Sequence, residues 1–337
     1  LLLRAAGRNR ALDDRLAEIA PDLVVVGTGG TEPLSLDALR AARAQGIPSL
    51  AVLHNWDALS AKGALPVAPD HVAVWGTQTA RHAQSIAGLP AGAAHVLGSP
   101  VLDAYLRLPP QAPPPLPGHV LFAGCYAPFD ERDAVAAVVA ALDELDSGAR
   151  VRYRPHPDRA DRLAPDEVDP DGRVELDRDV AEGYAAAQAL GRRRAGAPGY
   201  PPLAGYPAVI RGARCVVSPL STMVLEAALL GVPTVVIAWD DGVHPVPLTT
   251  LARFEHFAGL DALPHFRFVH ERGQLCAALA WALSAARPVA SVSLLEPFVH
   301  HDEQPYAARL AALVAQLGAA AGTPARVRGP GGSVTSP

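Results

Sequence analysis

Short apolar runs alternate with amphipathic segments along most of this chain of 337 residues. The clearest example is residues 214–237, where a β-branched run at 214–217 precedes a helical pattern and a second apolar run at 234–237. Apolar runs of this length are typical of strands buried on both faces of a parallel sheet. Gly231 and Pro233 mark the end of the intervening helix. The segment therefore predicts a strand, a helix and a second strand.

The same alternation recurs on both sides of this segment. We predict strands at residues 22–27, 48–53, 71–75, 95–97, 119–123, 151–154 and 266–269, and helices at 34–45, 78–87, 130–145, 271–285 and 305–317. Strands that alternate with helices predict an α/β fold with parallel, helix-covered sheets.

A proline-rich stretch divides this pattern in two. Residues 108–118, LPPQAPPPLPG, hold too many prolines for a helix or a central strand and predict an extended linker. We therefore expect one α/β domain over residues 1–107 and a second over 119–318. Residues 191–207 predict an irregular loop, and residues 319–337 a disordered tail rich in Ala, Gly, Pro and Ser.

The composition is that of an ordinary globular protein. Half of the residues are hydrophobic and the net charge is −5, which argues against a nucleic-acid partner. No apolar run is long enough to span a bilayer. The three cysteines are far apart in sequence, which predicts neither a disulfide framework nor a metal site and fits a reducing cytoplasm. The chain begins at Leu1 and its single methionine is Met223, so no signal peptide is visible.

Polar residues gather after the strand at 214–217. Ser221 and Thr222 occupy predicted N-cap positions of the following helix, with Ser218 just before them. A helix N-terminus beyond the carboxyl end of a strand favours a phosphate, and Glu226, one turn later, could accept hydrogen bonds from ribose hydroxyl groups. The alternative is a helix cap that binds no ligand.

Other strand ends in both domains carry candidate ligand residues. Arg154 and His156 lie in the rigid sequence Arg-Pro-His-Pro, where they could bind a donor diphosphate at the same sheet edge. Gly124 and Ser99 each follow a strand, and small residues let the backbone approach a ligand closely. Both could equally form tight turns.

The sequence HNWDALSAKG at residues 54–63 follows a strand of the first domain. His54 could act as a general base there, with Asp57 fixing its tautomer. Lys62 is the only lysine of the chain and Asn55 one of two asparagines, so a compact ammonium could meet an anionic acceptor or a phosphate. The alternative is that His54 and Trp56 merely pack the domain cleft while Asp57 caps the next helix.

Several of these motifs together resemble a known class of enzymes. The pattern SxxSTxxLEAxxxGxP at residues 218–233, RPHP at 154–157 and the two-domain layout resemble GT-B-fold transferases that use nucleotide-activated donors. Within this class, HNWDALSAKG, PDHVAVWG and VLGSPVLD resemble bacterial cell-surface glycan glycosyltransferases and CDP-glycerol glycerophosphotransferase-like proteins. The resemblance spans roughly residues 20–280 and is more specific for the fold than for the substrate.

This resemblance implies two Rossmann-like domains facing a cleft, with the donor nucleotide bound mostly by the C-terminal domain and the acceptor by the N-terminal one. No metal or other cofactor is implied. Ser221 and Thr222 match phosphate-contacting positions. Glu226 matches the ribose-binding glutamate and His156 the donor-phosphate histidine, whereas His54 matches the catalytic base only loosely. The implied partners are a nucleotide-activated donor and a glycan or lipid-linked acceptor, with peripheral association at the inner membrane left open.

The resulting hypothesis is a cytoplasmic, metal-independent glycosyltransferase of cell-envelope polysaccharide synthesis. Three alternatives stay open: glycerol phosphate transfer from CDP-glycerol, a UDP-sugar 2-epimerase-like activity, and a degenerate GT-B module that binds a nucleotide without turnover. Gly231-Val232-Pro233 also occurs in the 2-epimerases that share the fold. The first domain is shorter than a usual GT-B first half, so part of the acceptor site is expected to be absent.

Overall fold

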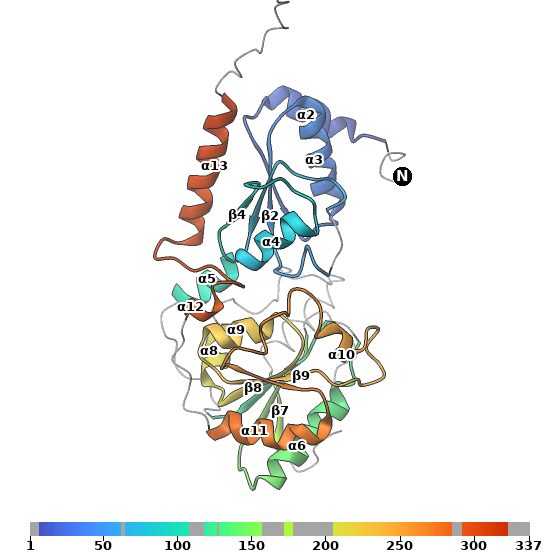
Figure 1. Cartoon of the computed structure of the whole chain (residues 1–337), viewed down its shortest axis with the longest axis vertical. Coiled ribbons are helices and arrows are strands. Elements are labelled where there is room, and N and C mark those ends of the chain that lie inside the picture. Colours follow the sequence, from blue (N-terminus) through green and yellow to red (C-terminus); the bar gives the residue numbers. More distant parts are fainter. Residues whose placement is uncertain are drawn as a thin grey trace, which may run out of the picture. The chain divides into compact units, whose positions relative to one another are not determined.

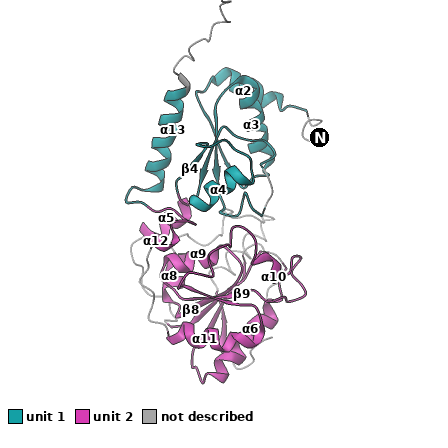
Figure 2. Ribbon diagram, viewed as in Figure 1, with its two compact units in different colours: residues 1–97, 302–337 teal, residues 98–301 magenta. Residues whose placement is uncertain are grey.

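The structure, a computed structural model, describes residues 7–61, 65–107, 118–126, 128–156, 172–177, 205–284 and 292–322. The chain folds into two compact units, each with its own parallel sheet (Figure 1, Figure 2). Unit 1 comprises Leu1–Leu97 and Asp302–Pro337, and unit 2 comprises Gly98–His301. The described residues form one sheet of four strands and one of six, which confirms the predicted α/β class.

The sheet of unit 1 is built from strands in simple sequential order. It contains β1 (Val24–Thr28), β2 (Ser49–Leu53), β3 (His71–Val74) and β4 (Ala94–Val96), all parallel. The buried side chains of one face pack with three helices, namely α2 (Arg10–Ile19), α3 (Pro33–Gln45) and α4 (Thr77–Ser85). Apolar residues at alternate strand positions thus form one layer of the core.

The opposite face of this sheet is covered by the last helix of the chain, α13 (Tyr306–Gly322). Leu313 and Leu317 of α13 pack with Leu50 and Ala73 of the sheet. The helix therefore belongs to unit 1, whereas the sequence assigned it to the second domain. The apolar pattern predicts that the helix covers a sheet, but it does not say which sheet.

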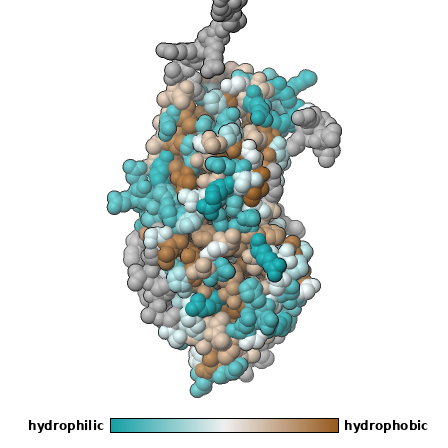
Figure 3. Space-filling view, viewed as in Figure 1, coloured by the Kyte–Doolittle hydropathy of each residue, from teal (hydrophilic) through white to brown (hydrophobic). Residues whose placement is uncertain are grey.

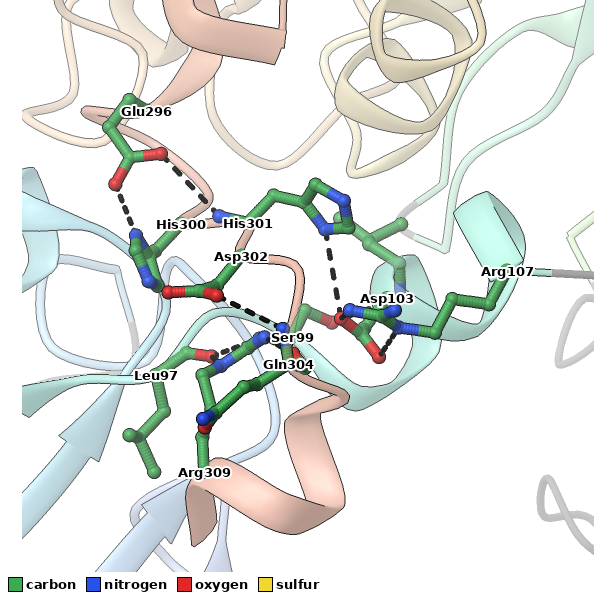
Figure 4. A network of polar contacts seen from close by, with 11 residues as sticks. Leu97, Ser99, Asp103, Arg107, Glu296, His300, His301, Asp302, Gln304 and Arg309 are labelled. Atoms are coloured by element: carbon green, nitrogen blue, oxygen red, sulfur yellow. Dashed lines mark hydrogen bonds and ion pairs between the residues drawn. The ribbon is translucent and has the colours of Figure 1, made fainter. Parts of the chain in front are cut away.

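A buried arginine fixes α13 to the sheet that it covers. Arg309 donates from Nε and Nη2 to the carbonyl oxygen of Leu97, at 3.2 and 2.8 Å (Figure 4). The helix also runs further than expected, because residues 319–322 are helical rather than part of a tail. Alanine is the strongest helix former, which explains the extension. Residues 323–337 lie outside the described part.

The sheet of unit 2 has the strand order β10-β9-β8-β5-β6-β7, and all of its strand pairs are parallel. Its strands are β5 (Val120–Ala123), β6 (Val151–Arg154), β7 (Val174–Leu176), β8 (Cys215–Pro219), β9 (Thr234–Ile237) and β10 (Phe266–Val269). This is the strand order of a doubly wound α/β sheet, in which the fourth strand returns to the side of the first.

Helices cover both faces of this second sheet (Figure 1). On one face lie α6 (Glu131–Glu144) and α11 (Leu275–Ser284), which share a core with the strands. On the other lie α8 (Gly205–Gly212) and α9 (Met223–Leu229), with α5 (Pro100–Arg107) packed on α9. Short helices at α10 (Leu248–Leu251), α12 (Val292–Leu295) and η2 (Arg272–Gln274) complete the unit.

The unit boundaries differ from the predicted domain boundaries. Unit 2 begins at Gly98, and the unpredicted helix α5 belongs to it rather than to the first domain. The last part of the loop predicted at 191–207 is the start of α8, where Pro207 sits in the first turn that tolerates proline. Residues 108–117 of the predicted linker lie outside the described part. The helix α2 and the strand β7 were not predicted either.

The surface gives no broad apolar face in the orientation shown. Hydrophobic and hydrophilic residues are interspersed over the visible face of both units (Figure 3). Within the described residues, no helix combines the length and apolar character needed to cross a membrane. None of the three cysteines, all of which are described, forms a disulfide.

Candidate functional site

The first candidate region is the carboxyl edge of the sheet in unit 2. There β5 and β8 are neighbours, although two other strands come between them along the chain. Ligands of open α/β sheets bind at such a switch point, beyond the carboxyl ends of the strands. Gly124 directly follows β5, and Ser221 and Thr222 follow β8. The structure therefore brings these three predicted donor-site residues to the switch point.

Ser218, also predicted to bind the donor, lies inside this turn. It is fully buried, and its Oγ lies 3.0 Å from the carbonyl oxygen of Ala123 and 3.0 Å from Ser221 Oγ. The Ser218 hydroxyl group can donate its one proton to the Ala123 carbonyl oxygen. This hydrogen bond links the end of β8 to the end of β5. Ser218 is thus buried inside the turn, and its predicted contact with the donor stays a prediction.

Ser221 and Thr222 do not form the predicted helix cap. Thr222 precedes α9 with helical dihedral angles (φ −61°, ψ −23°), and its side chain makes no capping hydrogen bond. A capping side chain normally needs an extended backbone at that position. Both residues are half-buried, and the Ser221 hydroxyl group contacts that of Ser218 rather than the backbone of the helix.

A buried group of charges lies at the ends of β6 and β7. Arg154 Nε donates to Asp177 Oδ2 at 2.7 Å, and Arg152 Nη2 donates to Asp177 Oδ1 at 3.1 Å. Asp177 is fully buried, which by itself would raise the pKa of its carboxyl group, but the charges of Arg154 and Arg152 lower that pKa. Arg152 and Arg154 share one face of β6 because alternate side chains point the same way.

Glu226 of α9 faces this group of charges. Tyr105 of α5 hydrogen-bonds to its carboxyl group, and the Oε2 atom of Glu226 is buried without a hydrogen-bond partner in the described part of the chain. Burial raises the pKa of Glu226 to about 7, against the lowering effects of the Tyr105 hydrogen bond and the Arg154 charge. A carboxyl group with an unused buried oxygen is a place for a ligand hydroxyl group.

Arg154 carries a second buried polar atom of this kind. Its guanidinium group lies over the ring of Tyr206, 4.7 Å from the ring centroid, and its side chain is 7% exposed. The Nη1 atom has no hydrogen-bond partner among the described residues. Arg154 and Glu226 therefore each offer an unused polar atom beside the switch point.

His156 lies on the loop after β6, two residues beyond Arg154. Its half-buried ring meets the ring of Tyr126 edge-on, with 5.5 Å between the centroids, and Tyr126 is 70% exposed. The loops that follow β5 and β6 are therefore in contact. Pro157 lies outside the described residues.

The position of Gly124 has no room for a larger residue, because the Glu131 carboxyl group of the same unit lies against it. A Cβ atom at this position would lie 2.4 Å from Glu131 Oε1. The buried Glu131 accepts hydrogen bonds from Tyr153 Oη and from the backbone N–H of Cys125, so its carboxyl group cannot easily move away. The small residue after β5 thus serves the packing of a buried carboxyl group, whatever ligand it also admits.

The second candidate region is the carboxyl edge of the sheet in unit 1. His54 follows β2 and is exposed, with its Nε2 atom 2.8 Å from the position of a Cβ atom built on Gly27. The neighbouring Trp56 is buried. Packing therefore accounts for Trp56 but not for His54, which is exposed at the edge where a base was predicted.

Asp57 lies in a turn rather than at the start of a helix. Its carbonyl oxygen accepts from the N–H groups of Ser60 and Ala61, at 3.1 and 2.9 Å. Lys62 lies outside the described residues. Ser99 is buried, and its Oγ accepts from the N–H of Leu102 at 3.4 Å at the start of α5 in unit 2, so it caps a helix and belongs with the other unit.

Glu32, which was not predicted as a site residue, also lies at this edge. Its carboxylate accepts from Thr28 Oγ1 at 2.5 Å and from the N–H of Gly29 at 2.8 Å. Partial burial would raise the pKa of Glu32, but these hydrogen bonds, with the charge of His54, lower it to about 2. A Cβ atom on Gly29 would lie 3.0 Å from Glu32 Oε1 and 3.9 Å from Asn55 Nδ2. In the sequence, Glu32 is a glutamate four residues after the end of β1, in a segment that predicts only a turn. That pattern did not indicate a functional role for the residue.

The histidine pair near the end of the chain is occupied by local contacts (Figure 4). His300 pairs with Glu296, and His301 Nδ1 lies 3.7 Å from Asp103 Oδ1. Asp302 Oδ1 accepts from the N–H of Gln304 at 3.0 Å. Within the described part of the chain, no three His, Cys, Asp or Glu side chains come together to hold a metal ion.

No protein-family model and no curated protein matches the sequence. The structure is similar to UDP-GlcNAc 2-epimerase from Methanocaldococcus jannaschii in complex with UDP-GlcNAc and UDP (14% identity, TM-score 0.55, 91% of this chain and 79% of that chain). It is also similar to S. aureus MnaA with UDP (14%, 0.58, 90% and 78%). A third similar structure is UDP-N-acetylglucosamine 2-epimerase from Rickettsia bellii (15%, 0.51, 92% and 77%). At these identities the similarity establishes the GT-B-like fold.

Proposed function

We propose that this protein is an enzyme that binds a nucleoside-diphosphate sugar through unit 2 and acts on its sugar. The observation that supports this most strongly is the pair of buried, unused polar atoms, Glu226 Oε2 and Arg154 Nη1, beside the switch point of a nucleotide-binding sheet. Unused atoms of this kind are costly to the folded protein unless a ligand or solvent satisfies them.

The proposed roles follow the chemistry of each side chain. Glu226 accepts hydrogen bonds from the ribose hydroxyl groups, and Arg154 and His156 donate to the diphosphate. The hydroxyl groups of Ser221 and Thr222 add donors on the same edge, next to the backbone of Gly124. The M. jannaschii structure was determined with UDP-GlcNAc and UDP, which makes uridine nucleotides the first ligands to test.

The proposed reaction is glycosyl transfer to an acceptor hydroxyl group of a glycan or a lipid-linked acceptor. His54 acts as the general base at the edge of the sheet in unit 1, with Asp57 and Asn55 beside it. Lys62 binds an anionic part of the acceptor. The exposure of His54 supports this role, because a base must reach a proton of the acceptor.

The second candidate is epimerisation at C2 of the sugar, and the similar structures favour it because they are UDP-GlcNAc 2-epimerases. Inversion at C2 needs a proton to be removed from that carbon and returned to the other face. Glu32, held ionised, and His54 are two ionisable side chains at the first edge that could take part in these proton transfers. Transfer of glycerol phosphate and ligand binding without turnover remain outcomes of the tests.

Calorimetric titration with UDP, UDP-GlcNAc and CDP-glycerol tests the donor site. We expect Glu226→Gln to weaken binding of the preferred nucleotide about 10–100-fold, because a charged hydrogen bond contributes about 1.5–3 kcal/mol. Glu175→Gln is the matched control, since Glu175 lies on β7 and pairs with Arg150 at 2.5 Å. Equal affinity of wild type and Glu226→Gln would reject the ribose assignment.

Proton NMR of the bound sugar distinguishes the reactions. A 2-epimer that forms from UDP-GlcNAc without any acceptor identifies an epimerase, whereas release of UDP that depends on an acceptor identifies a transferase. His54→Ala should lower turnover about 10²–10⁴-fold and leave the nucleotide Kd unchanged, with His270→Ala as control. Unchanged turnover in His54→Ala would remove His54 from the reaction.

A further inference from the structure

Tyr105 is a buried side chain whose position has a consequence for Glu226. It belongs to α5, is 3% exposed, and its hydroxyl group hydrogen-bonds to the Glu226 carboxyl group. Burial and the Glu226 charge both raise the pKa of Tyr105, so its hydroxyl group keeps its proton and acts as a donor. The backbone of Tyr105 is also fixed, since Arg211 Nη2 of α8 donates to its carbonyl oxygen at 3.0 Å.

The other side of Glu226 faces Arg154, which is itself held firmly. Asp177 binds Arg154 Nε at 2.7 Å, and the ring of Tyr206 lies 4.7 Å below the guanidinium group. When Glu226 is ionised, the positive charges of Arg152 and Arg154 are balanced by the negative charges of Asp177 and Glu226. The Glu226 carboxyl group is therefore set between a neutral donor and a fixed cation.

We propose that Tyr105 is a positioning residue of the donor site, which holds the Glu226 carboxyl group so that its second oxygen is presented to the ribose diol of the nucleotide. This inference rests on the proposed function, in which Glu226 binds the ribose. Without the Tyr105 hydroxyl group, the carboxyl group can rotate and takes up a proton more readily. Both changes reduce its ability to accept two hydroxyl donors.

The variant Tyr105→Phe removes only the hydroxyl group and keeps the ring and the backbone contact to Arg211. We expect a loss of about 5–10-fold in affinity for UDP, which is what one hydrogen bond contributes. Binding of 2′,3′-dideoxyuridine diphosphate should hardly change, because that ligand has no diol to present to Glu226. Tyr306→Phe is the matched control, since Tyr306 is a buried tyrosine of unit 1.

A measurement without ligand separates positioning from general loosening of the fold. Carbon-13 NMR of labelled glutamate gives the pKa of the Glu226 carboxyl group, with Glu226→Gln identifying the signal. The Tyr105 hydrogen bond lowers that pKa, so Tyr105→Phe should raise it, whereas Tyr306→Phe should leave it unchanged.

The outcomes distinguish this inference from the proposed function. If the wild type binds no nucleotide, the proposed function is wrong, and the ribose role of Tyr105 falls with it. If the wild type prefers UDP to the dideoxy ligand and Tyr105→Phe keeps that preference in full, the nucleotide site stands and the positioning role is overturned. An unchanged Glu226 pKa in Tyr105→Phe also overturns it.

Discussion

The carboxyl edges of the two sheets each hold a glutamate, and the two glutamates are in opposite states. In unit 1, Glu32 accepts hydrogen bonds from Thr28 Oγ1 and the N–H of Gly29, and its pKa is lowered to about 2. In unit 2, burial raises the pKa of Glu226 to about 7, and one of its oxygens has no partner among the described residues. Glu32 is therefore satisfied by hydrogen bonds from its own loop, whereas Glu226 is not.

This difference teaches how to separate scaffold from site. A carboxylate that accepts two hydrogen bonds from its own loop stabilises that loop, here the segment between β1 and α3. A carboxyl group with a buried oxygen that accepts no hydrogen bond from the protein can accept one from a ligand. This criterion supports the proposal that Glu226 and Arg154 bind the ligand, whereas Glu32 shapes the edge on which His54 lies.

The largest expected effect concerns Asp177, the buried carboxylate that accepts hydrogen bonds from Arg152 and Arg154 in unit 2. Asp177→Ala leaves Arg152 and Arg154 without their carboxylate, and we expect a loss of about 3–5 kcal/mol in the free energy of unfolding. Denaturant unfolding measures it. Asp143→Ala is the control, because Asp143 pairs with Arg173 but its side chain is 62% exposed, so the change should stay below about 1 kcal/mol. Similar losses in both variants would show that the buried charges are not held as the structure has them.

The sequence predicted the alternation of strands and helices well, because strands buried on both faces leave an unbroken apolar run. Arg154 and Glu226 were predicted as donor-site residues from motifs near strand ends, and the structure places both beside the same sheet edge, while their role stays a prediction. Asp177 was not, because it follows a strand of three residues and acquires its role from β6, more than twenty positions earlier. Ser218 shows the remaining difficulty: the side to which its hydroxyl group points depends on its pairing with β5.

A smaller effect tests one glycine at each edge, namely Gly27 near the end of β1 and Gly124 directly after β5. Gly124→Ala pushes a Cβ atom against the buried Glu131 carboxyl group, and overpacking of this kind costs about 1–3 kcal/mol. Gly27→Ala places a Cβ atom 2.8 Å from Nε2 of the exposed His54 ring, which is the end of a surface side chain rather than a buried carboxyl group, so we expect a smaller loss than in Gly124→Ala. Thermal unfolding of the two variants compares them directly. Equal losses would show that the edge of unit 1 is as rigid as that of unit 2.

The most direct test of the two glutamates is the pH dependence of the free energy of unfolding, because their two contributions differ in direction. The pKa of Glu32 is lowered in the folded state from 4.5 to about 2, so its contribution to stability is present above pH 4.5 and is lost as the pH falls toward 2. The pKa of Glu226 is raised from 4.5 to about 7, so its contribution is present below pH 4.5 and is lost as the pH rises through 7.

The variants Glu32→Gln and Glu226→Gln should therefore remove opposite slopes from a plot of unfolding free energy against pH. Glu32→Gln should flatten the acid side only, and Glu226→Gln the range between pH 4.5 and 7 only. Saturating UDP sharpens the comparison, because a ligand that binds the ionised Glu226 shifts its titration to lower pH and leaves that of Glu32 in place. If UDP changed the unfolding free energy only on the acid side, where Glu32 titrates, the nucleotide would bind at the edge of unit 1. The assignment of the nucleotide site to Glu226 would then be wrong.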